Sequence, residues 1–205
     1  MVPGTQSQVI PQNVITRSSN QSTGIEFTWS VWINITDLTS STLKTSTYKH
    51  IFSKGNGDFN AQNVATPNNA PGLYIAPNTN TLVVIMNTYD VINEEIFVTD
   101  IPMNKWVNVM IRCQNTTFDV YINGTIARSI QLVGVPKQNY GDVYVLQNGG
   151  FNGYLSDLWY YNKALGTTAI QQIVAKGPNT KSATGSTDPI ANTQADYLSL
   201  RWYMN

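Results

Sequence analysis

Charged side chains are scarce in this chain. Only 12% of its 205 residues are Asp, Glu, Lys or Arg, about half the usual share, and 12 basic residues balance 12 acidic ones. Without a basic excess the chain lacks the electrostatic footprint of a protein that binds nucleic acid or an anionic membrane surface. We therefore expect no nucleic-acid partner.

Cysteine and histidine each occur once, as Cys113 and His50. A single cysteine excludes an internal disulfide framework, and one residue of each kind excludes a conventional zinc site. Cys113 alternates with apolar residues, so we interpret it as a small buried hydrophobe. No nucleophile spacing accompanies His50, and we interpret it as a structural residue at a strand end that bonds to the backbone.

Long hydrophobic runs are absent as well. No stretch approaches the length of a transmembrane helix, and residues 1–12 lack the apolar core of a signal peptide. We therefore expect no direct membrane insertion by this chain.

Asparagine and threonine supply the polarity instead, with 23 of each. Asparagine suits turns and threonine suits strand surfaces, and neither side chain titrates. This composition favours a virion or extracellular surface over a cytosolic enzyme.

Short runs in which apolar residues occur at every second position recur along the chain. Turn-forming residues separate them at spacings typical of a β-sandwich. These runs predict strands at residues 25–34, 50–54, 71–76, 81–88, 94–99, 106–114, 118–123, 125–132, 142–147 and 151–161. We expect one domain at residues 25–177. A polar segment at 1–24 precedes it, with an edge strand limited by Pro11. A polar tail at 178–205 follows it and returns as an edge strand over Tyr197–Tyr203.

The segment 149–178, GGFNGYLSDLWYYNKALGTTAIQQIVAKGP, combines a strand, a turn and a helix. Large apolar groups alternate on both faces of the strand, which predicts a central position in a sheet. Thr168 and Gln171 have capping-box spacing, and Gly177 with Pro178 forms a stop signal. The sequence therefore predicts a short helix that packs its apolar stripe, Ile170, Ile173 and Val174, on a sheet.

This segment resembles the closing signature of laminin-G-like, concanavalin A-like jelly-roll domains, a strand with F-x-G-x-L that leads to a short helix. Three further segments match in the same order: FTWSVWI at 27–33, HIFSKG at 50–55 and KWVNVMIRCQNTTFDVYINGT at 105–125. The resemblance implies an all-β fold, a two-sheet antiparallel jelly-roll sandwich with one short C-terminal helix. The motif FSKG, followed later in the chain by PGLYI, is also similar to motifs of uncharacterised proteins of large DNA viruses.

The glycosidases that share this fold use a carboxylate pair on one strand, in a motif similar to Glu-x-Asp-x-(x)-Glu. The three glutamates here are Glu26, Glu94 and Glu95, and none is followed by Asp two residues later. Glu94 and Glu95 are adjacent, so they point to opposite faces of a strand. We therefore predict no catalytic residues and no enzymatic activity.

Four predicted loops should share one rim of the sandwich, because consecutive antiparallel strands alternate direction. These loops are 55–70, 88–92, 115–117 and 133–141. Related laminin-G-like domains often bind Ca²⁺ at such a rim, and Asp58, Asp90 and Asp142 with amide and carbonyl oxygens would supply its ligands. The alternative is that these aspartates only form turns.

The same rim is the predicted sugar site. Carbohydrate recognition pairs an aromatic ring with amide and carboxylate groups that bond the hydroxyls. The predicted ligand-binding residues are Asp58, Phe59, Asn60, Tyr89, Asn139 and Tyr140. An aromatic residue in a loop is alternatively explained by packing.

Taken with the resemblance, these features predict a non-catalytic carbohydrate-binding or adhesion domain, displayed on a virion or cell surface. Its partner would be a glycan or glycoprotein surface. The alternative is a structural virion or minor capsid protein that contacts other virion proteins. A glycoside hydrolase is the third hypothesis and requires two carboxyl groups about 5 to 9.5 Å apart in a cleft.

Overall fold

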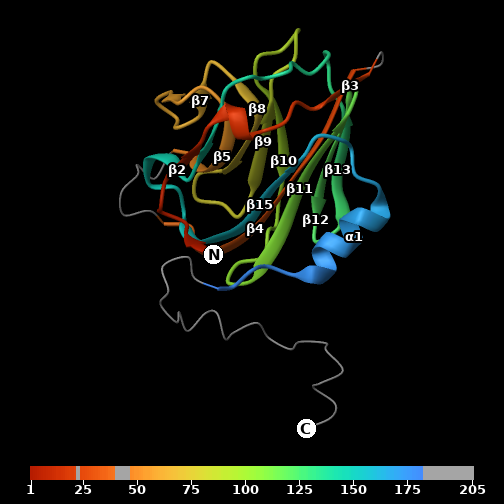
Figure 1. Cartoon of the computed structure of the whole chain (residues 1–205). Helices are drawn as coiled ribbons and strands as arrows, with labels where there is room; N and C mark the ends of the chain where they lie inside the picture. The colour runs from red at the N-terminus through yellow and green to blue at the C-terminus, as the bar shows by residue number, and fades with distance from the viewer. Residues whose placement is uncertain (22–23, 40–46, 182–205) are drawn as a thin grey trace.

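The protein folds as two antiparallel sheets packed face to face with one helix outside them (Figure 1). The computed structural model describes residues 1–21, 24–39 and 47–181. Within these residues there is a seven-stranded sheet, a six-stranded sheet and a small two-stranded one. The predicted all-β jelly-roll sandwich with one short helix is confirmed. The expected strand at Tyr197–Tyr203 lies outside the described residues.

The seven-stranded sheet has β4 at its centre, paired antiparallel with β15 on one side and β11 on the other. A short strand, β3, pairs with the beginning of β4. The strands run in the order β1 (Val2–Pro3), β15 (Asn152–Tyr161), β4 (Gly24–Asp37), β11 (Trp106–Gln114), β12 (Thr117–Ile122) and β13 (Thr125–Gln131), with β3 at Ser19–Gln21.

The six-stranded sheet contains the predicted hairpin, in which β8 and β9 pair antiparallel. Its order is β10 (Glu94–Val98), β9 (Leu82–Met86), β8 (Asn69–Ile75), β5 (Lys49–Gly55), β14 (Asp142–Val145) and β2 (Gln8–Ile10). Strand β2 is an edge strand and ends directly before Pro11. The loop between β5 and β8 carries the small hairpin of β6 (Asp58–Phe59) and β7 (Ala65–Thr66).

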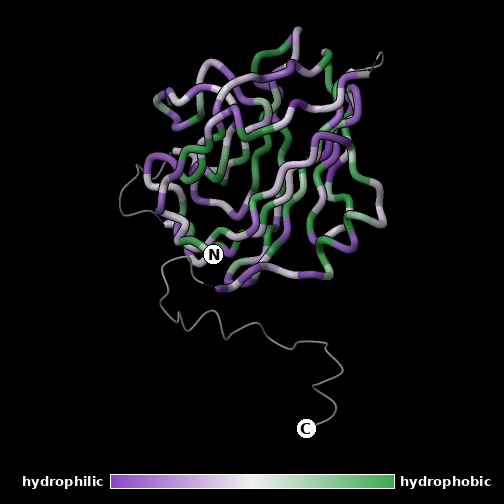
Figure 2. The backbone as a smooth tube through the Cα atoms, viewed as in Figure 1, coloured by the Kyte–Doolittle hydropathy of each residue, from purple (hydrophilic) through white to green (hydrophobic). Residues whose placement is uncertain are grey.

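The core lies between the two large sheets, where Figure 2 shows apolar segments facing one another. Alternate residues of β4, among them Phe27, Trp29 and Ile33, point into it and are at most 4% exposed. The Trp29 ring lies 5.1 Å from Phe52 of the opposite sheet and 4.8 Å from Tyr160, measured between centroids. The period of two in the sequence therefore corresponds to real burial on one face.

The prediction that β15 is a central strand is confirmed only in part, because β15 has a neighbour on each side but lies next to the outermost described strand of the sheet. Strand β15 has β4 on one side and only the two residues of β1 on the other. A β-bulge between Ser156 and Trp159, with Asp157 at φ 49°, shifts the alternation of its side chains. Leu155 faces the core before the bulge and Tyr160 packs against it after the bulge, while Trp159 is 49% exposed.

Helix α1 (Thr167–Lys176) packs on the outer face of the seven-stranded sheet, as predicted. Its apolar stripe contacts Met110 of β11 and Tyr121 of β12, and Ile170 is fully buried among them. The predicted capping box is wrong, because Gly166 is the N-cap and makes no side-chain cap. Gln171 instead donates a hydrogen bond from Nε2 to the Gly124 carbonyl, at 2.9 Å.

None of the helices in the described residues is long and apolar enough to cross a membrane.

Candidate functional site

Three loops adjoin at one end of the sandwich, between β5 and β8, β9 and β10, and β13 and β14. The Asn87 N–H donates to the Asn69 carbonyl at 2.8 Å, and the Lys137 N–H donates to the Asn87 carbonyl at 3.0 Å. The Tyr89 N–H donates to the Val135 carbonyl at 3.0 Å. These backbone bonds fix the loops to one another and form the rim that the alternation of strand directions predicts.

A cleft of about 230 Å³ opens at this rim. One wall comes from the β13–β14 loop and the other from the N-terminal segment that follows β2. The lining residues are Gln12, Asn13, Ile15, Thr16, Arg17, Lys54, Gln138, Asn139 and Tyr140. We call this the rim cleft.

An aromatic ring and a guanidinium group mark the mouth of the rim cleft. Tyr140 is 55% exposed, and the Arg17 Cζ lies 4.8 Å from the centre of its ring, which is cation–π geometry. Asn139 accepts a hydrogen bond at Oδ1 from the Gly141 N–H, at 2.7 Å, and so holds the turn that presents Tyr140. The cleft therefore combines an aromatic face with cationic and amide donors.

Lys54 lies at the inner end of the rim cleft. It pairs with Val143 of β14, whose side chain is in the core, so both side chains point inward. The Lys54 side chain extends along this face, and its Nζ donates a hydrogen bond to the Gly141 carbonyl at 2.6 Å. Burial lowers the pKa of Lys54, and the nearby Asp142 carboxylate partly opposes that shift.

Asp142 ties the N-terminal wall to the sheet. Its Oδ1 accepts a hydrogen bond at 2.8 Å from the backbone N–H of Gln12, which begins a 3₁₀ turn over Gln12–Val14. The segment that carries Arg17 is therefore fixed beside the β13–β14 loop. The structure gives Asp142 a positioning role in this wall.

Tyr89 and Asp90 lie on the neighbouring β9–β10 loop and do not line the rim cleft. Tyr89 is 71% exposed, and the Lys137 Nζ lies 5.3 Å from its ring centre. Asp90 packs against Gly134, where a Cβ would collide with its carboxylate. Both predicted residues thus share the rim with the cleft but stand outside it.

Asp58, Phe59 and Asn60 belong to the β6–β7 hairpin, which is also separate from the rim cleft. The Phe59 ring packs edge-on against His50 with 5.1 Å between centroids. The Asn60 Oδ1 accepts hydrogen bonds from the N–H groups of Gln62 and Val64, so it builds the turn. Of the six predicted ligand-binding residues, only Asn139 and Tyr140 line the cleft.

The carboxylates predicted to bind calcium do not form a cluster. Among the described residues there is no group of three or more His, Cys, Asp or Glu side chains arranged to hold a metal ion. Asp58, Asp90 and Asp142 come from three different elements, and a calcium ion bound to any of them would need carbonyl or amide oxygens for most of its shell. Calcium binding stays a prediction.

Sequence reasoning missed Arg17 and Lys54. Arg17 is the only charged residue among the first 24, a segment that we interpreted as a polar extension. Lys54 follows the apolar run of the HIFSKG strand, where its inward direction is visible only once its pairing with Val143 is known. An isolated charge in an uncharged segment was the one available signal.

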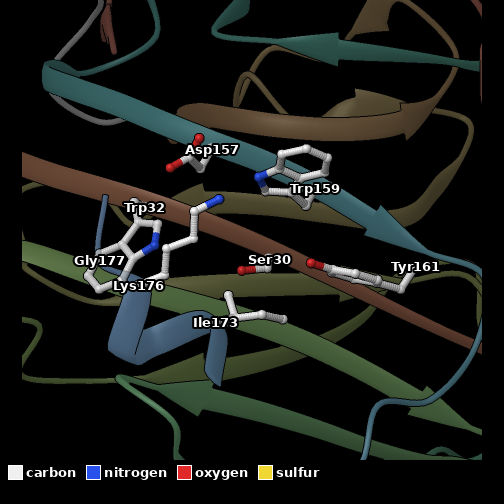
Figure 3. A pocket seen from close by; sticks show the side chains of 8 residues that line it. All are labelled: Ser30, Trp32, Asp157, Trp159, Tyr161, Ile173, Lys176 and Gly177. Carbon is white, nitrogen blue, oxygen red and sulfur yellow. The ribbon is translucent and has the colours of Figure 1, made fainter. Parts of the chain in front are cut away.

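A second cleft, of about 220 Å³, lies on the outer face of the seven-stranded sheet beside α1 (Figure 3). We call it the helix cleft. Trp159 and Asp157 of β15 line one side, Trp32 of β4 lies beneath, and Lys176 reaches from α1 toward the strand. Asp157 Oδ2 accepts a hydrogen bond of 2.8 Å from the Asn179 N–H, and it is the one carboxylate among the described lining residues.

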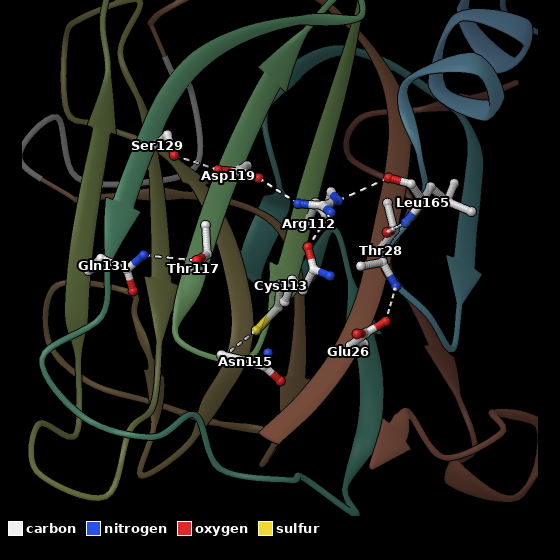
Figure 4. Close-up of polar contacts among 12 residues, drawn as sticks. Glu26, Thr28, Arg112, Cys113, Asn115, Thr117, Asp119, Ser129, Gln131 and Leu165 are labelled. Carbon is white, nitrogen blue, oxygen red and sulfur yellow. Dashed lines mark hydrogen bonds and ion pairs between the residues drawn. The ribbon is translucent and has the colours of Figure 1, made fainter. Parts of the chain in front are cut away.

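The single histidine and the single cysteine of the chain are both buried inside the sandwich. Burial lowers the pKa of His50 to about 3 and raises the pKa of the Cys113 thiol to about 12. Cys113 Sγ contacts the Asn115 carbonyl at 3.4 Å (Figure 4), and the His50 Nδ1 accepts a hydrogen bond from the Gln147 N–H at 3.0 Å. Neither group reaches a cleft, so both serve the fold.

A two-sheet antiparallel jelly roll is the architecture of lectin-like domains. Residues 5–171 match the family described as the concanavalin A-like lectin/glucanases superfamily, and the chain belongs to this superfamily. This confirms the resemblance to concanavalin A-like jelly-roll domains that was drawn from the sequence motifs. A search of curated proteins finds no match to the chain.

Solved structures of botulinum neurotoxin binding domains share this fold. The receptor binding domain of the C/D mosaic serotype superimposes with a TM-score of 0.57 at 15% identity, over 83% of this chain and 40% of that one. The serotype G binding domain gives 0.55 at 14%, over 87% and 46%. A type C structure, of a toxin whose cell entry depends on two ganglioside molecules, gives 0.56 at 16%, over 85% and 40%. The chain therefore spans less than half the length of these domains.

Proposed function

We propose that this protein is a non-catalytic glycan-binding domain and that the rim cleft is its binding site. The observation that carries the proposal is the exposed Tyr140 ring beside Arg17, at the mouth of a cleft lined by the amides of Asn139 and Gln138. A sugar presents apolar C–H groups on a ring face and hydroxyls around its edge. An aromatic ring with surrounding amides and cations matches both surfaces.

Two comparisons support a binding role. The superfamily is lectin-like, and the similar solved structures are binding domains, one of them from a toxin that depends on gangliosides. The superfamily also includes glucanases. Glycoside hydrolysis requires a pair of carboxylates in a cleft. Among the described residues, the helix cleft is lined by one carboxylate, that of Asp157, and the rim cleft is lined by none, so neither cleft favours hydrolysis.

The test is a glycan array with the whole chain, in buffers with and without Ca²⁺. We expect binding that the Tyr140→Ala variant loses and the Tyr140→Phe variant largely keeps, because the ring makes the contact. Trp159→Ala is the matched control, since it removes an exposed aromatic side chain from the helix cleft. Binding that depends on Trp159 and not on Tyr140 would overturn the rim assignment, and no binding to any glycan would overturn the function.

We further propose that the domain is displayed on a virion or cell surface, where its partner is a glycan or glycoprotein. The low charge and the abundance of Asn and Thr support this location. The remaining candidate is a structural virion protein that acts through protein contacts. The outermost strand that the structure describes in the seven-stranded sheet, β13, favours it, because six of its seven residues are exposed and an edge strand is a surface for pairing.

A further inference from the structure

The Lys54 ammonium group is buried and makes no ion pair with any described residue. Its residue is 7% exposed, and no carboxylate in the described residues lies within 4.0 Å of its Nζ. The one hydrogen bond that it makes is to the Gly141 carbonyl, at 2.6 Å. Two of the three N–H donors of the ammonium group therefore have no partner among the residues that the structure describes.

A buried cation in this state is unfavourable for folding. Buried charges are normally paired or hydrogen-bonded, because removal from water is not otherwise compensated. Asp142 lies near enough to raise the pKa of Lys54 but makes no ion pair with it, so the compensation is partial. The protein retains a poorly compensated cation at this position, which indicates that an anion from outside completes the site.

Lys54 also lines the rim cleft, so such an anion can reach it. Arg17 lies on the opposite, N-terminal wall, and no acidic side chain is among the described lining residues. Lys137 adds a third cation at the rim, in a narrow recess that Lys54, Gln138 and Asn139 also line. The three cations at the rim therefore outnumber the one described carboxylate near Lys54, that of Asp142, although the whole chain has no net charge.

We propose that the rim cleft binds an acidic sugar, with the carboxylate of the sugar placed between Lys54 and Arg17. The inference rests on the proposed glycan-binding function and adds the class of glycan. A carboxylate accepts several hydrogen bonds at once, so it satisfies the free donors of Lys54 and the guanidinium of Arg17. The ring and hydroxyls of the sugar then contact Tyr140 and the amides of Gln138 and Asn139. An inorganic anion would use the cations alone.

The experiment compares an acidic and a neutral glycan on the whole chain by NMR titration, with 3′-sialyllactose and lactose as the probes. We expect 3′-sialyllactose to bind at least tenfold more tightly than lactose. We also expect this preference to shrink as salt rises, because the pair of charges is only partly shielded from solvent. A terminal glucuronic acid in place of sialic acid should keep the preference, since the carboxylate is the shared group.

Lys54→Met is the decisive variant. It should reduce the affinity for 3′-sialyllactose about tenfold or more, the size expected for a charge-assisted hydrogen bond in a buried site, and leave lactose binding unchanged. Its melting temperature without ligand should equal or exceed that of the native chain, because an uncompensated ammonium is removed. A purely structural lysine would instead give a lower melting temperature. Lys176→Met makes the same change in the helix cleft and should alter neither property.

The outcomes separate this inference from the function on which it rests. Equal binding of 3′-sialyllactose and lactose, or a preference that survives Lys54→Met, would overturn the acidic-sugar site and leave glycan binding intact. No binding to either sugar, together with no binding on the glycan array, would overturn both. Stabilisation by inorganic phosphate that Lys54→Met abolishes, without sugar binding, would show a simple anion site and would overturn the proposal as well.

Discussion

His50 accepts a hydrogen bond at its Nδ1 from the backbone N–H of Gln147, at 3.0 Å, and this bond joins β5 to the turn that follows β14. The Nε2 lies 2.9 Å from the Ser53 Oγ, and the rings of Phe59 and Tyr74 pack edge-on against the imidazole. Because Nδ1 accepts, the proton of the neutral ring is on Nε2 and points to Ser53. A buried, neutral histidine of β5 thus contacts β8, the small β6–β7 hairpin and the turn that follows β14.

This arrangement predicts that acid destabilises the fold through His50. Unfolded His50 takes up a proton as the pH falls through its ordinary pKa of 6.5, whereas burial keeps the folded residue neutral down to a pKa of about 3. The stability that depends on a neutral His50 is fully present above pH 6.5 and is lost as the pH falls from 6.5 toward 3. We expect the free energy of unfolding to decrease by about 1 kcal/mol per pH unit in this window.

Urea unfolding at pH 6.5 and pH 5.0 measures this slope above the range in which ordinary carboxylates titrate. The His50→Asn variant is the control, because its amide oxygen can still accept a hydrogen bond but does not titrate. The variant should be less stable overall and show a flatter pH dependence. Equal slopes for the native and variant chains would show that other groups cause the acid sensitivity.

The ion pair between Arg112 and Asp119 predicts that the fold is sensitive to substitution of either residue. Their ion pair, 2.8 Å between Nη1 and Oδ2, joins β11 to β12, and Arg112 Nε also donates to the Leu165 carbonyl before α1 (Figure 4). Asp119 Oδ1 accepts a hydrogen bond from Ser129 of β13 at 2.6 Å. We expect Asp119→Asn and Arg112→Met each to reduce the free energy of unfolding by about 2 to 3 kcal/mol, because each leaves an unpaired charge on a side chain that is at most 16% exposed.

The double variant tests whether the two residues act as a pair. It should lose less stability than the sum of the single variants by about 1 kcal/mol or more, measured by urea unfolding at one pH. Arg128→Met is the matched control, since Arg128 is exposed and its one hydrogen bond within the described residues is to the Phe97 carbonyl, at 3.2 Å. A change of less than about 0.5 kcal/mol is expected there. Additive losses at Arg112 and Asp119 would contradict the pairing.

Much of the fold was readable from the sequence. The strand predicted at residues 106–114 has these same bounds in β11, because its apolar alternation ends at the turn formed by Asn115 and Thr116. Irregular backbone, such as bulges and very short strands, could not be predicted from the sequence. The residues around Asp157 carry no sequence signal of a β-bulge. The alternation in β15 therefore predicted the wrong face of the sheet for the side chains beyond the bulge. The hairpin of β6 and β7 was predicted as loop, because two-residue strands carry no periodicity.

The site was predicted at the level of loops but not of residues. Alternating strand directions place the β5–β8, β9–β10 and β13–β14 loops at one end, and the rim cleft lies there with Tyr140 and Asn139. The second wall depends on a contact across the sequence, between the Gln12 N–H and Asp142. The inward direction of Lys54 depends on strand register. Neither is encoded in local periodicity, so the cations of the cleft were missed.

Gly153 is the glycine of the motif F-x-G-x-L, and the structure explains its role. Its φ is +147°, and a Cβ there would press on the Asn34 carbonyl of β4 and on the Phe151 ring. We expect Gly153→Ala to reduce the free energy of unfolding by about 2 to 3 kcal/mol through strain and overpacking.

Gly166→Ser is the matched control in thermal or urea unfolding. Gly166 has open space around it and is the N-cap of α1, so the change should be within about 0.5 kcal/mol. Comparable losses in both variants would refute the steric explanation.

Calcium binding at the rim is the prediction that a thermal melt tests most directly. An ion that binds only the folded chain raises the melting temperature by mass action, so millimolar Ca²⁺ should raise it and EGTA should reverse the increase. Asp142 is the first ligand to test, because only its Oδ1 is engaged, by the Gln12 N–H, and the Gly141 carbonyl lies beside it in the chain. Asp142→Asn should abolish the calcium shift, whereas Asp58→Asn and Asp90→Asn show whether those separate carboxylates take part. A melting temperature that does not respond to calcium would exclude the ion at millimolar concentration and leave the cations of Lys54 and Arg17 as the charged groups available to a ligand.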